Sequence, residues 1–291
     1  MLHRCIVVIT CLLACVSVLS SACVRADSSS PLTIRIASSL EDYSIFRQAV
    51  EQGRCLETWD IAADTRRNEL EILLLCRAFL RDNPEHRIEL LPSANYARSI
   101  RMVKSGSADV SGETVWADDA EALALSNAVL AQGEIEKGIY TRVDHPVRSY
   151  PTDQVDLGAM HGVMVSNWTY DWQLINGLTG HVSSAMNTNS AFKIINLGRA
   201  DFTLSELPAT DDMSVLCGEE RLFPIYGVKV LMPGARHFAV SNVSENADEV
   251  YAALNRGLQL MRESGELKTL YQHIGFMSER TQEWKVLEAK S

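Results

Sequence analysis

The 291-residue chain lacks an excess of basic residues, and this absence excludes one class of partner. It has 27 Lys and Arg against 37 Asp and Glu, a formal charge of −10. A chain this acidic, without a basic run, repels phosphate backbones, so we expect no nucleic-acid binding. Its 16 Gly and 8 Pro are too few for a collagen-like or low-complexity chain. With 46% hydrophobic and 22% charged residues, the composition is typical of a globular protein with a substantial core.

Motifs of catalysis and of metal binding are also missing. The sequence contains no G-x-S-x-G, no H-E-x-x-H and no C-x-x-C, and its seven His residues are scattered. A lone His is usually an ordinary surface or core residue. We therefore expect no catalytic residue, no metal site and no cofactor.

One long apolar run occurs, at the N-terminus. A 15-residue apolar stretch, 5–19, follows a short basic start and precedes small residues. This layout predicts a secretory signal peptide at 1–26, because the apolar stretch is short for a membrane span. Cleavage after Ala26 would release a soluble periplasmic protein, whereas cleavage after Ala22 would leave Cys23 for lipid attachment and anchoring in the envelope. Both routes stay open, as does a retained anchor helix, and export is the firmer prediction.

Beyond residue 26, no apolar run approaches the roughly 20 residues that a membrane span needs. We expect a short polar tether at 27–31, and contact with the membrane only through a lipid on Cys23.

Cysteine is scarce after the leader, which leaves only Cys55, Cys76 and Cys217. In an oxidising compartment three thiols allow one bridge and one leftover thiol. Cys55 lies in a loop after Gly53, and Cys76 lies in the first long predicted helix, which follows that loop in the same half of the chain. We therefore predict a Cys55–Cys76 disulfide with Cys217 free. The alternative is that all three thiols are buried and reduced, since Cys76 also fits an apolar helical face.

The rest of the chain alternates between strand-like and helical patterns. The first unit has predicted strands at 32–37, 87–91 and 108–110, and predicted helices at 68–82 and 96–104. The second unit has predicted strands at 138–142, 162–165 and 200–204, and a predicted helix at 189–197. A helical stretch at 248–274, interrupted at Gly265, follows. The β-α-β order predicts mostly parallel sheets.

This order resembles the type II periplasmic binding fold, and specifically solute-binding protein family 3. The resemblance covers essentially the whole chain after the leader. Two segments, Ser-Gly-Ser-Ala-Asp-Val at 105–110 and Leu-Gly-Arg-Ala-Asp-Phe at 197–202, are similar to the family's G-x-x-D element. In that element a helix ends at Gly and the next strand begins after Asp. The segment 257–271 is similar to the family's terminal helix pair.

The resemblance implies an α/β protein of two lobes, each a mostly parallel sheet flanked by helices, with a ligand cleft between them. Lobe 1 would contain 32–134 plus 238–291, and lobe 2 would contain 135–237. The crossing segments near 132–135 and 233–239 would form a hinge, and a ligand that contacts both lobes would favour closure. Members of the family capture a small solute for ABC-type uptake or for sensing. The resemblance therefore implies a monomer with a membrane permease or a sensor as its partner.

The sequence departs from the amino-acid-binding members of the family at the ligand clamp. Those members hold the ligand carboxylate with an arginine after the third strand, and the equivalent position here falls at Asp119. Their acidic partner for the α-amino group falls near Ser205, with Glu206 beside it. We therefore predict that no standard L-amino acid binds tightly and that the cleft takes a neutral or cationic solute. An arginine that reaches the cleft from elsewhere, such as Arg98 or Arg101, would restore the clamp.

The candidate ligand-binding residues are those that the resemblance places at the cleft. They are Ser38, Ser39, Glu113, Trp116, Ser166, Trp168, Tyr170, Ser205 and Glu206. Aromatic rings beside carboxylates suit stacking and cation–π contact with a cationic or sugar-like solute. The acidic run around Asp119 also fits an ordinary solvated helix start, and Trp168 also fits core packing.

Two functions of other classes stay open. One is a degenerate periplasmic sensor or partner protein without a transport role. The other is an enzyme, because some members of this fold are dehydratases with carboxylates in the cleft, and Glu113 and Glu206 could serve as such a pair.

Overall fold

The computed structural model describes residues 30–39, 47–57, 61 and 65–289. The predicted signal peptide at 1–26, the lipid site at Cys23 and most of the tether at 27–31 lie outside this part of the chain and stay predictions. In the described part, no helix combines the length and the apolar character that crossing a bilayer requires.

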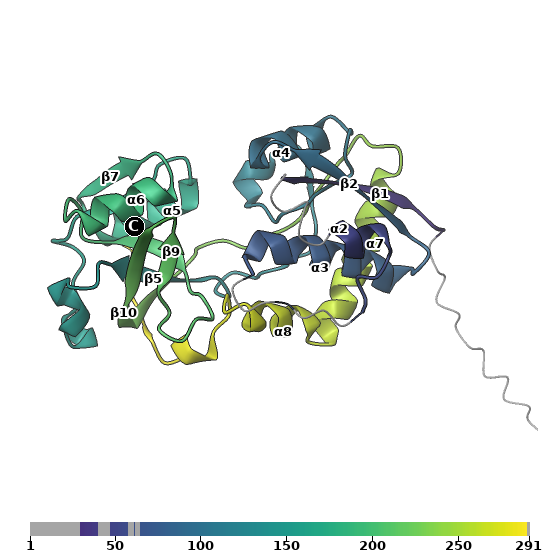
Figure 1. Cartoon of the computed structure of the whole chain (residues 1–291). Coiled ribbons are helices and arrows are strands. Elements are labelled where there is room, and N and C mark those ends of the chain that lie inside the picture. Colours follow the sequence, from purple (N-terminus) through teal and green to yellow (C-terminus); the bar gives the residue numbers. More distant parts are fainter. Residues whose placement is uncertain (1–29, 40–46, 58–60, 62–64, 290–291) are drawn as a thin grey trace, which may run out of the picture.

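The strands form two main groups, each with its own helices, and we call these groups lobe 1 and lobe 2 (Figure 1). The sheet of lobe 1 has the order β2-β1-β3-β11-β4. Its strands are β1 (Thr33–Ser39), β2 (Arg87–Ser93), β3 (Val110–Ser111), β4 (Ala124–Leu125) and β11 (Ala239–Val240). β1 pairs in parallel with β2 and β3, whereas β11 runs antiparallel to β3 and β4. The alternating pattern at the start of β1 buries Ile34 and Ile36 completely.

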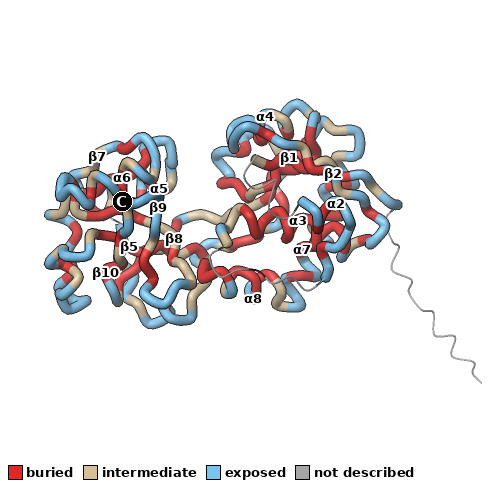
Figure 2. The backbone as a smooth tube through the Cα atoms, in the orientation of Figure 1, coloured by how far each residue is buried: buried red, intermediate tan, exposed pale blue. Residues whose placement is uncertain are grey.

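Lobe 1 contains one helix, α3 (Arg67–Asp82), that is almost wholly buried. The helices of this lobe are α2 (Arg47–Glu51), α3, α4 (Tyr96–Lys104), the short η1 (Ala117–Ala120), α7 (Ala247–Glu263) and α8 (Glu266–His273). Every residue of α3 from Glu69 to Leu80 is buried. Buried segments run along α3 and through both groups of strands (Figure 2). A helix buried on all sides must find internal partners for its charged residues.

Two glycines shape this helical layer. α7 packs against α3 so closely that a Cβ on Gly257 would lie 1.8 Å from the carbonyl oxygen of Ala78. Gly265, with φ of 76°, separates α7 from α8. This is the interruption that the sequence predicts, since the left-handed conformation that ends a helix favours glycine.

The predicted Cys55–Cys76 disulfide is confirmed. The two Cα atoms lie 6.0 Å apart, and both residues are fully buried. The bond ties the segment after α2 to the middle of α3, and Cys217 is free. Closing a loop of this length contributes about 3 kcal/mol to stability.

Lobe 2 contains a sheet of order β12-β10-β5-β8, with β9 paired to β10, and a separate β6–β7 pair. Its strands are β5 (Glu136–Thr141), β6 (Gly162–Val165), β7 (Val182–Ala185), β8 (Thr203–Glu206), β9 (Val215–Cys217), β10 (Glu220–Leu231) and β12 (Lys285–Val286). Its helices are α5 (Thr169–Leu178) and α6 (Thr188–Asn196), with short turns η2 (Pro146–Ser149), η3 (Thr152–Gln154) and η4 (Glu279–Thr281).

Strand pairing in lobe 2 differs from the mostly parallel sheet that the sequence predicts. β5 pairs antiparallel with both β8 and β10. Between named strands, parallel pairing in the described part of lobe 2 is confined to β6–β7 and β10–β12. The reason is the path of the chain, which enters lobe 2 through β5 and returns through β10. These two neighbours must therefore run in opposite directions.

Two neighbouring segments, 126–135 and 232–238, connect the lobes close to the predicted crossings. An antiparallel bridge joins Leu130 to Arg236, and the N–H of Met232 donates to the carbonyl of Ile135 at 2.9 Å. The end of the chain also crosses, because the segment after α8 runs to lobe 2 and β12 pairs with β10 (Figure 1). The expected boundary assigned all of 238–291 to lobe 1. A two-residue strand carries no hydrophobic period that could have indicated this pairing.

Candidate ligand-binding site

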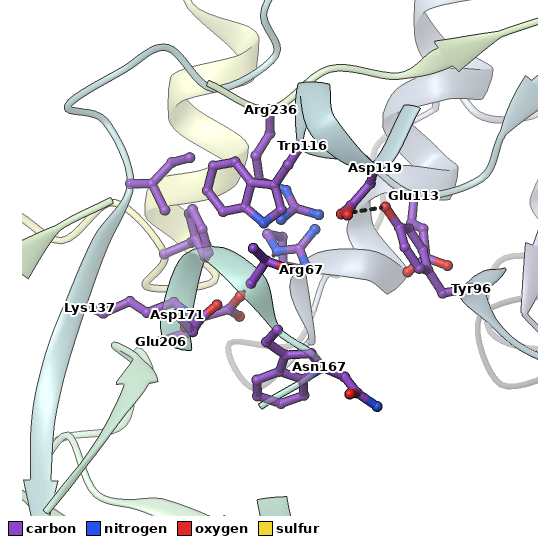
Figure 3. A pocket seen from close by; sticks show the side chains of 14 residues that line it. Arg67, Tyr96, Glu113, Trp116, Asp119, Lys137, Asn167, Asp171, Glu206 and Arg236 are labelled. Carbon is purple, nitrogen blue, oxygen red and sulfur yellow. Dashed lines mark hydrogen bonds and ion pairs between the residues drawn. The ribbon is translucent and has the colours of Figure 1, made fainter. Parts of the chain in front are cut away.

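A cavity of about 350 Å³ lies between the lobes, against the crossing segments (Figure 3). Lobe 1 and the segment after α8 contribute Arg67, Tyr96, Glu113, Trp116, Asp119 and Phe276. Lobe 2 contributes Lys137, Asn167, Trp168, Thr169, Asp171 and Glu206, and the crossing segments contribute Ile135 and Arg236. This volume is at the lower end of the range of about 300–1,000 Å³ for small-molecule sites.

The structure brings together four of the nine candidate residues. Glu113, Trp116, Trp168 and Glu206 line the cavity, and Tyr170 contacts Trp116. The lining does not include the four predicted serines, which are Ser38, Ser39, Ser166 and Ser205. Three of them are held locally. The hydroxyl of Ser38 donates to the carbonyl of Ser39, Ser166 accepts a hydrogen bond from Ser184, and Ser205 lies opposite Gly138 in the β5–β8 ladder.

Trp116 is enclosed by the protein itself. Its ring stacks on Tyr170 at 4.4 Å between centroids, and the guanidinium of Arg236 lies 4.7 Å from its ring centroid. Only 9% of Trp116 is exposed. The cation over this ring is therefore an internal arginine, whereas Trp168, 46% exposed, keeps a surface that a solute could contact.

Glu71 is the centre of a buried polar network beneath the cavity. It is fully buried and accepts five hydrogen bonds: two from Arg67, two from Thr114 and one from the hydroxyl of Tyr271. Burial and the charge of Glu71 raise the pKa of Tyr271, so its hydroxyl keeps its proton and donates. The network is fully hydrogen-bonded around this carboxylate, which is the condition for a stable buried charge.

Arg67 also reaches across the cavity to lobe 2. Its Nε lies 3.1 Å from a carboxylate oxygen of Glu206 on β8. Burial would lower the pKa of Arg67, but the charges of Glu71 and Glu206 raise it well above its ordinary value. Burial would likewise raise the pKa of Glu206, and the charges of Arg67 and Lys137 outweigh that effect and lower it. Glu206 is therefore a carboxylate at neutral pH.

Lys137 and Asp171 form a second ion pair, within lobe 2. Lys137 comes from β5 and Asp171 from the first turn of α5. Their side chains are 11% and 8% exposed, so the pair is largely shielded from solvent. Nearby, Asp119 accepts a hydrogen bond from the hydroxyl of Tyr96 at 3.1 Å, drawn as a dashed line in Figure 3.

Arg236 differs from the other two cations of the cavity. Its Nε donates to the hydroxyl of Thr114 at 2.7 Å, and its Nη2 donates to the Thr114 carbonyl. Within the described residues, no carboxylate lies within ion-pair distance of Arg236, and nothing accepts a hydrogen bond from its Nη1. Burial and the like charge of Arg67 lower its pKa. Among the described residues, Glu71 and Glu206 act on this positive charge only at longer range, without an ion-pair contact.

The two arginines in the cavity show that the missing arginine at Asp119 does not leave the lining without a guanidinium, and the neutral or cationic solute stays a prediction. Asp119 lines the cavity, as the resemblance implied, but the lining also contains Arg67 and Arg236. Arg98 and Arg101, the expected substitutes, are exposed on α4 and do not line it.

These residues gave little signal in the sequence. Arg67 and Glu71, four residues apart on a helix, match a common surface pair. Only the burial of α3 makes them an interior ion pair. Arg236 follows a Pro-Gly pair in the predicted hinge, and that position is the single available clue.

The two lobes, their crossing segments and the cavity between them define the type II periplasmic binding fold, which confirms the α/β two-lobed prediction. No family model matches the sequence, and no curated protein matches it significantly. Solved structures of solute-binding proteins are similar to it in fold.

One similar structure is the probable amino-acid ABC transporter extracellular-binding protein YtmK from Bacillus subtilis. It has a TM-score of 0.57 and 12% identity, over 85% of this chain and 99% of that one. The periplasmic VFT2 domain of Bordetella pertussis BvgS has a TM-score of 0.53 and 17% identity, over 84% and 93%. An ancestral cationic amino acid solute-binding protein has a TM-score of 0.51 and 15% identity, over 84% and 96%.

Proposed function

We propose that this protein is exported and binds a small polar solute between its two lobes, for uptake through a membrane permease or for sensing. The observation that carries the proposal is the cavity itself, which takes charged and aromatic side chains from both lobes. A solute that contacts both walls binds the closed arrangement better and shifts the population towards it. The crossing segments 126–135 and 232–238 would then act as the hinge.

We propose further that standard L-amino acids are not the ligand. A tight site for an α-ammonium group needs a carboxylate that is free to receive it. Glu206 is paired with Arg67, Asp171 with Lys137, and Asp119 with the hydroxyl of Tyr96. Glu113 also has a partner. An ammonium group would therefore meet a free carboxylate only if another part of the solute first displaced one of these partners.

A binding role is favoured over catalysis. Within the described part of the chain, the lining contains no Cys, His or Ser, so it offers no thiol, no serine hydroxyl and no imidazole base. Of the two carboxylates that a dehydratase-like mechanism would use, Glu206 has a lowered pKa and is ionised. An ionised carboxylate paired with an arginine cannot serve as a general acid near neutral pH.

The partner and the location belong to the same proposal. We expect a monomer in the periplasm, either free or anchored by a lipid on Cys23. It would deliver its solute to a membrane permease, or a membrane sensor would recognise its closed form. A degenerate partner protein would have the same fold without solute binding, so a binding experiment separates the two.

A thermal-shift screen of small solutes against the purified protein tests the proposal. A specific solute raises the melting temperature, because stabilisation grows as RT ln(1 + [L]/Kd). Trp168→Ala, which removes an exposed ring from the cavity, should weaken that binding about tenfold. Tyr150→Ala is the matched control, since Tyr150 is 50% exposed and lies outside the lining. If no solute stabilises the protein, or if the two variants bind alike, the proposed site is wrong.

A further inference from the structure

Two guanidinium groups meet at one hydroxyl beneath the cavity. Thr114 accepts a hydrogen bond from Nη1 of Arg67 at 3.2 Å and from Nε of Arg236 at 2.7 Å, while donating its own proton to Glu71. A hydroxyl has one donor and two acceptor positions, so Thr114 is saturated. Because both arginines also line the cavity, their remaining donors face the same space (Figure 3).

A carboxylate already lies beside these donors. Glu206 contacts Nε of Arg67, and the charge of Arg236 also stabilises its ionised form. The side chain of Glu206 is nonetheless 42% exposed, and its contact with Arg67 is a single hydrogen bond of 3.1 Å. By contrast, Glu71 binds the other edge of Arg67 with no exposure at all. Glu206 is therefore the anion in this group that can leave.

We propose that Arg67 and Arg236 form the binding site for one acidic group of the solute, and that Glu206 occupies part of this site until the solute displaces it. This inference rests on the proposed solute-binding function and narrows its ligand to an acid. A guanidinium presents a planar fork that matches a carboxylate, sulfonate or phosphonate. A solute with such a group satisfies Nη1 of Arg236, which has no acceptor within the described residues.

The exchange would also couple binding to the contact between lobes. Arg67 lies at the start of α3 in lobe 1, and Glu206 lies at the end of β8 in lobe 2. Displacing Glu206 replaces a direct contact between the lobes with one made through the solute. Glu206 would then set the affinity of the site for acids by competing with them, and Arg236 would set the preference for an acid over a neutral or cationic solute.

The test is a titration with small probe acids, followed through the indole N–H signals of the tryptophans by NMR. Acetate, benzoate, methanesulfonate and methylphosphonate are compared with acetamide, benzamide and methylammonium at constant ionic strength. The acid arms distinguish which acidic group the site prefers. The variants are Glu206→Gln, Arg236→Gln and Arg236→Lys, with Arg98→Gln as the control arginine outside the cavity.

We expect acids to bind the wild type and Glu206→Gln to bind them about tenfold more tightly, because the internal competitor has lost its charge. Arg236→Gln should weaken acid binding at least tenfold, Arg236→Lys less, and Arg98→Gln not at all. Because Arg236→Lys retains the charge, it serves if Arg236→Gln does not fold. Equal acid binding by wild type and both Arg236 variants would overturn the inference, as would weaker binding by Glu206→Gln. Amides or methylammonium binding in place of acids would overturn it while leaving the solute-binding proposal intact, and the absence of binding by every probe would count against both.

Discussion

Arg67 makes two ion pairs that differ in almost every physical respect. The pair with Glu71 lies within lobe 1, where the carboxylate is completely buried and accepts five hydrogen bonds. The pair with Glu206 spans the two lobes, and there the carboxylate is 42% exposed and accepts one hydrogen bond from Arg67. The same cation thus takes part in one permanent and one replaceable interaction.

The difference between the two ion pairs shows that the two lobes contribute to the site in different ways. Removing Arg67 would leave the charge of Glu71 without compensation in a medium of low polarity, and removing Glu71 would leave Arg67 with only its exposed partner Glu206. The pair between the lobes is close to solvent, where water or another anion can substitute at little cost. Lobe 1 therefore supplies the fixed half of the site, and lobe 2 supplies the half that can exchange.

The largest expected effect tests this contrast directly, with the same substitution at both carboxylates. Glu71→Ala should lower the free energy of unfolding by about 3–5 kcal/mol, because it leaves Nη1 of Arg67 without its carboxylate and Thr114 and Tyr271 without their acceptor. Glu206→Ala should change it by no more than about 1 kcal/mol. Urea unfolding followed by circular dichroism measures both. Similar losses in the two variants would remove the distinction between the pairs.

Removing the disulfide should have the next largest effect on stability. The bond lies in lobe 1, which also contains the permanent Arg67–Glu71 pair. Cys55→Ser combined with Cys76→Ser should lower the free energy of unfolding by about 3 kcal/mol. Without the bond, the unfolded chain regains the conformational entropy that closing a loop between residues 21 apart had removed. Cys217→Ser removes the free thiol and is the matched control, expected to leave stability unchanged. A double variant as stable as the wild type would show that α3 is held without the bond.

The smallest effect is a pH dependence that belongs to the replaceable pair. The pKa of Glu206 is lowered on folding, because Arg67 and Lys137 outweigh the effect of burial. Its contribution to stability is therefore present above the ordinary glutamate pKa of about 4.3 and is lost as the pH falls through the lower folded pKa. Unfolding of wild type and Glu206→Gln between pH 7 and pH 3 should give a difference of at most about 1 kcal/mol that shrinks with acid. A difference that grows as the pH falls would mean that the sign is wrong.

Local patterns predicted many of the elements well. The helix at 96–104 and the strand at 162–165 have the same bounds in the structure as in the sequence prediction. Both are bounded by residues that act within a few positions, such as Asn95, whose side chain caps α4, and Gly106, with φ of 72°. The Cys55–Cys76 bond was also predictable, because the small number of thiols after the predicted leader left few pairings.

The prediction failed where the deciding contacts join distant parts of the chain. The family resemblance placed four serines at the cleft, yet none of them lines the cavity. The antiparallel pairing of β5 with β10 and the return of β12 to lobe 2 join residues far apart in the sequence. No local period encodes such pairings.

The sequence by itself determined an acidic α/β chain, since periodicity and turn residues act over short distances. The family resemblance of its motifs implied the two lobes and placed Trp116, Trp168, Glu113 and Glu206 at the cleft. Only the tertiary structure decided the electrostatic character of the site. Arg67 and Glu71 have the spacing of an ordinary surface pair, and α3 becomes an interior helix only when the sheet and α7 cover it. Arg236 becomes a cation of the cavity only when the crossing segment lays it over Trp116, because the field at each charge depends on which distant groups surround it.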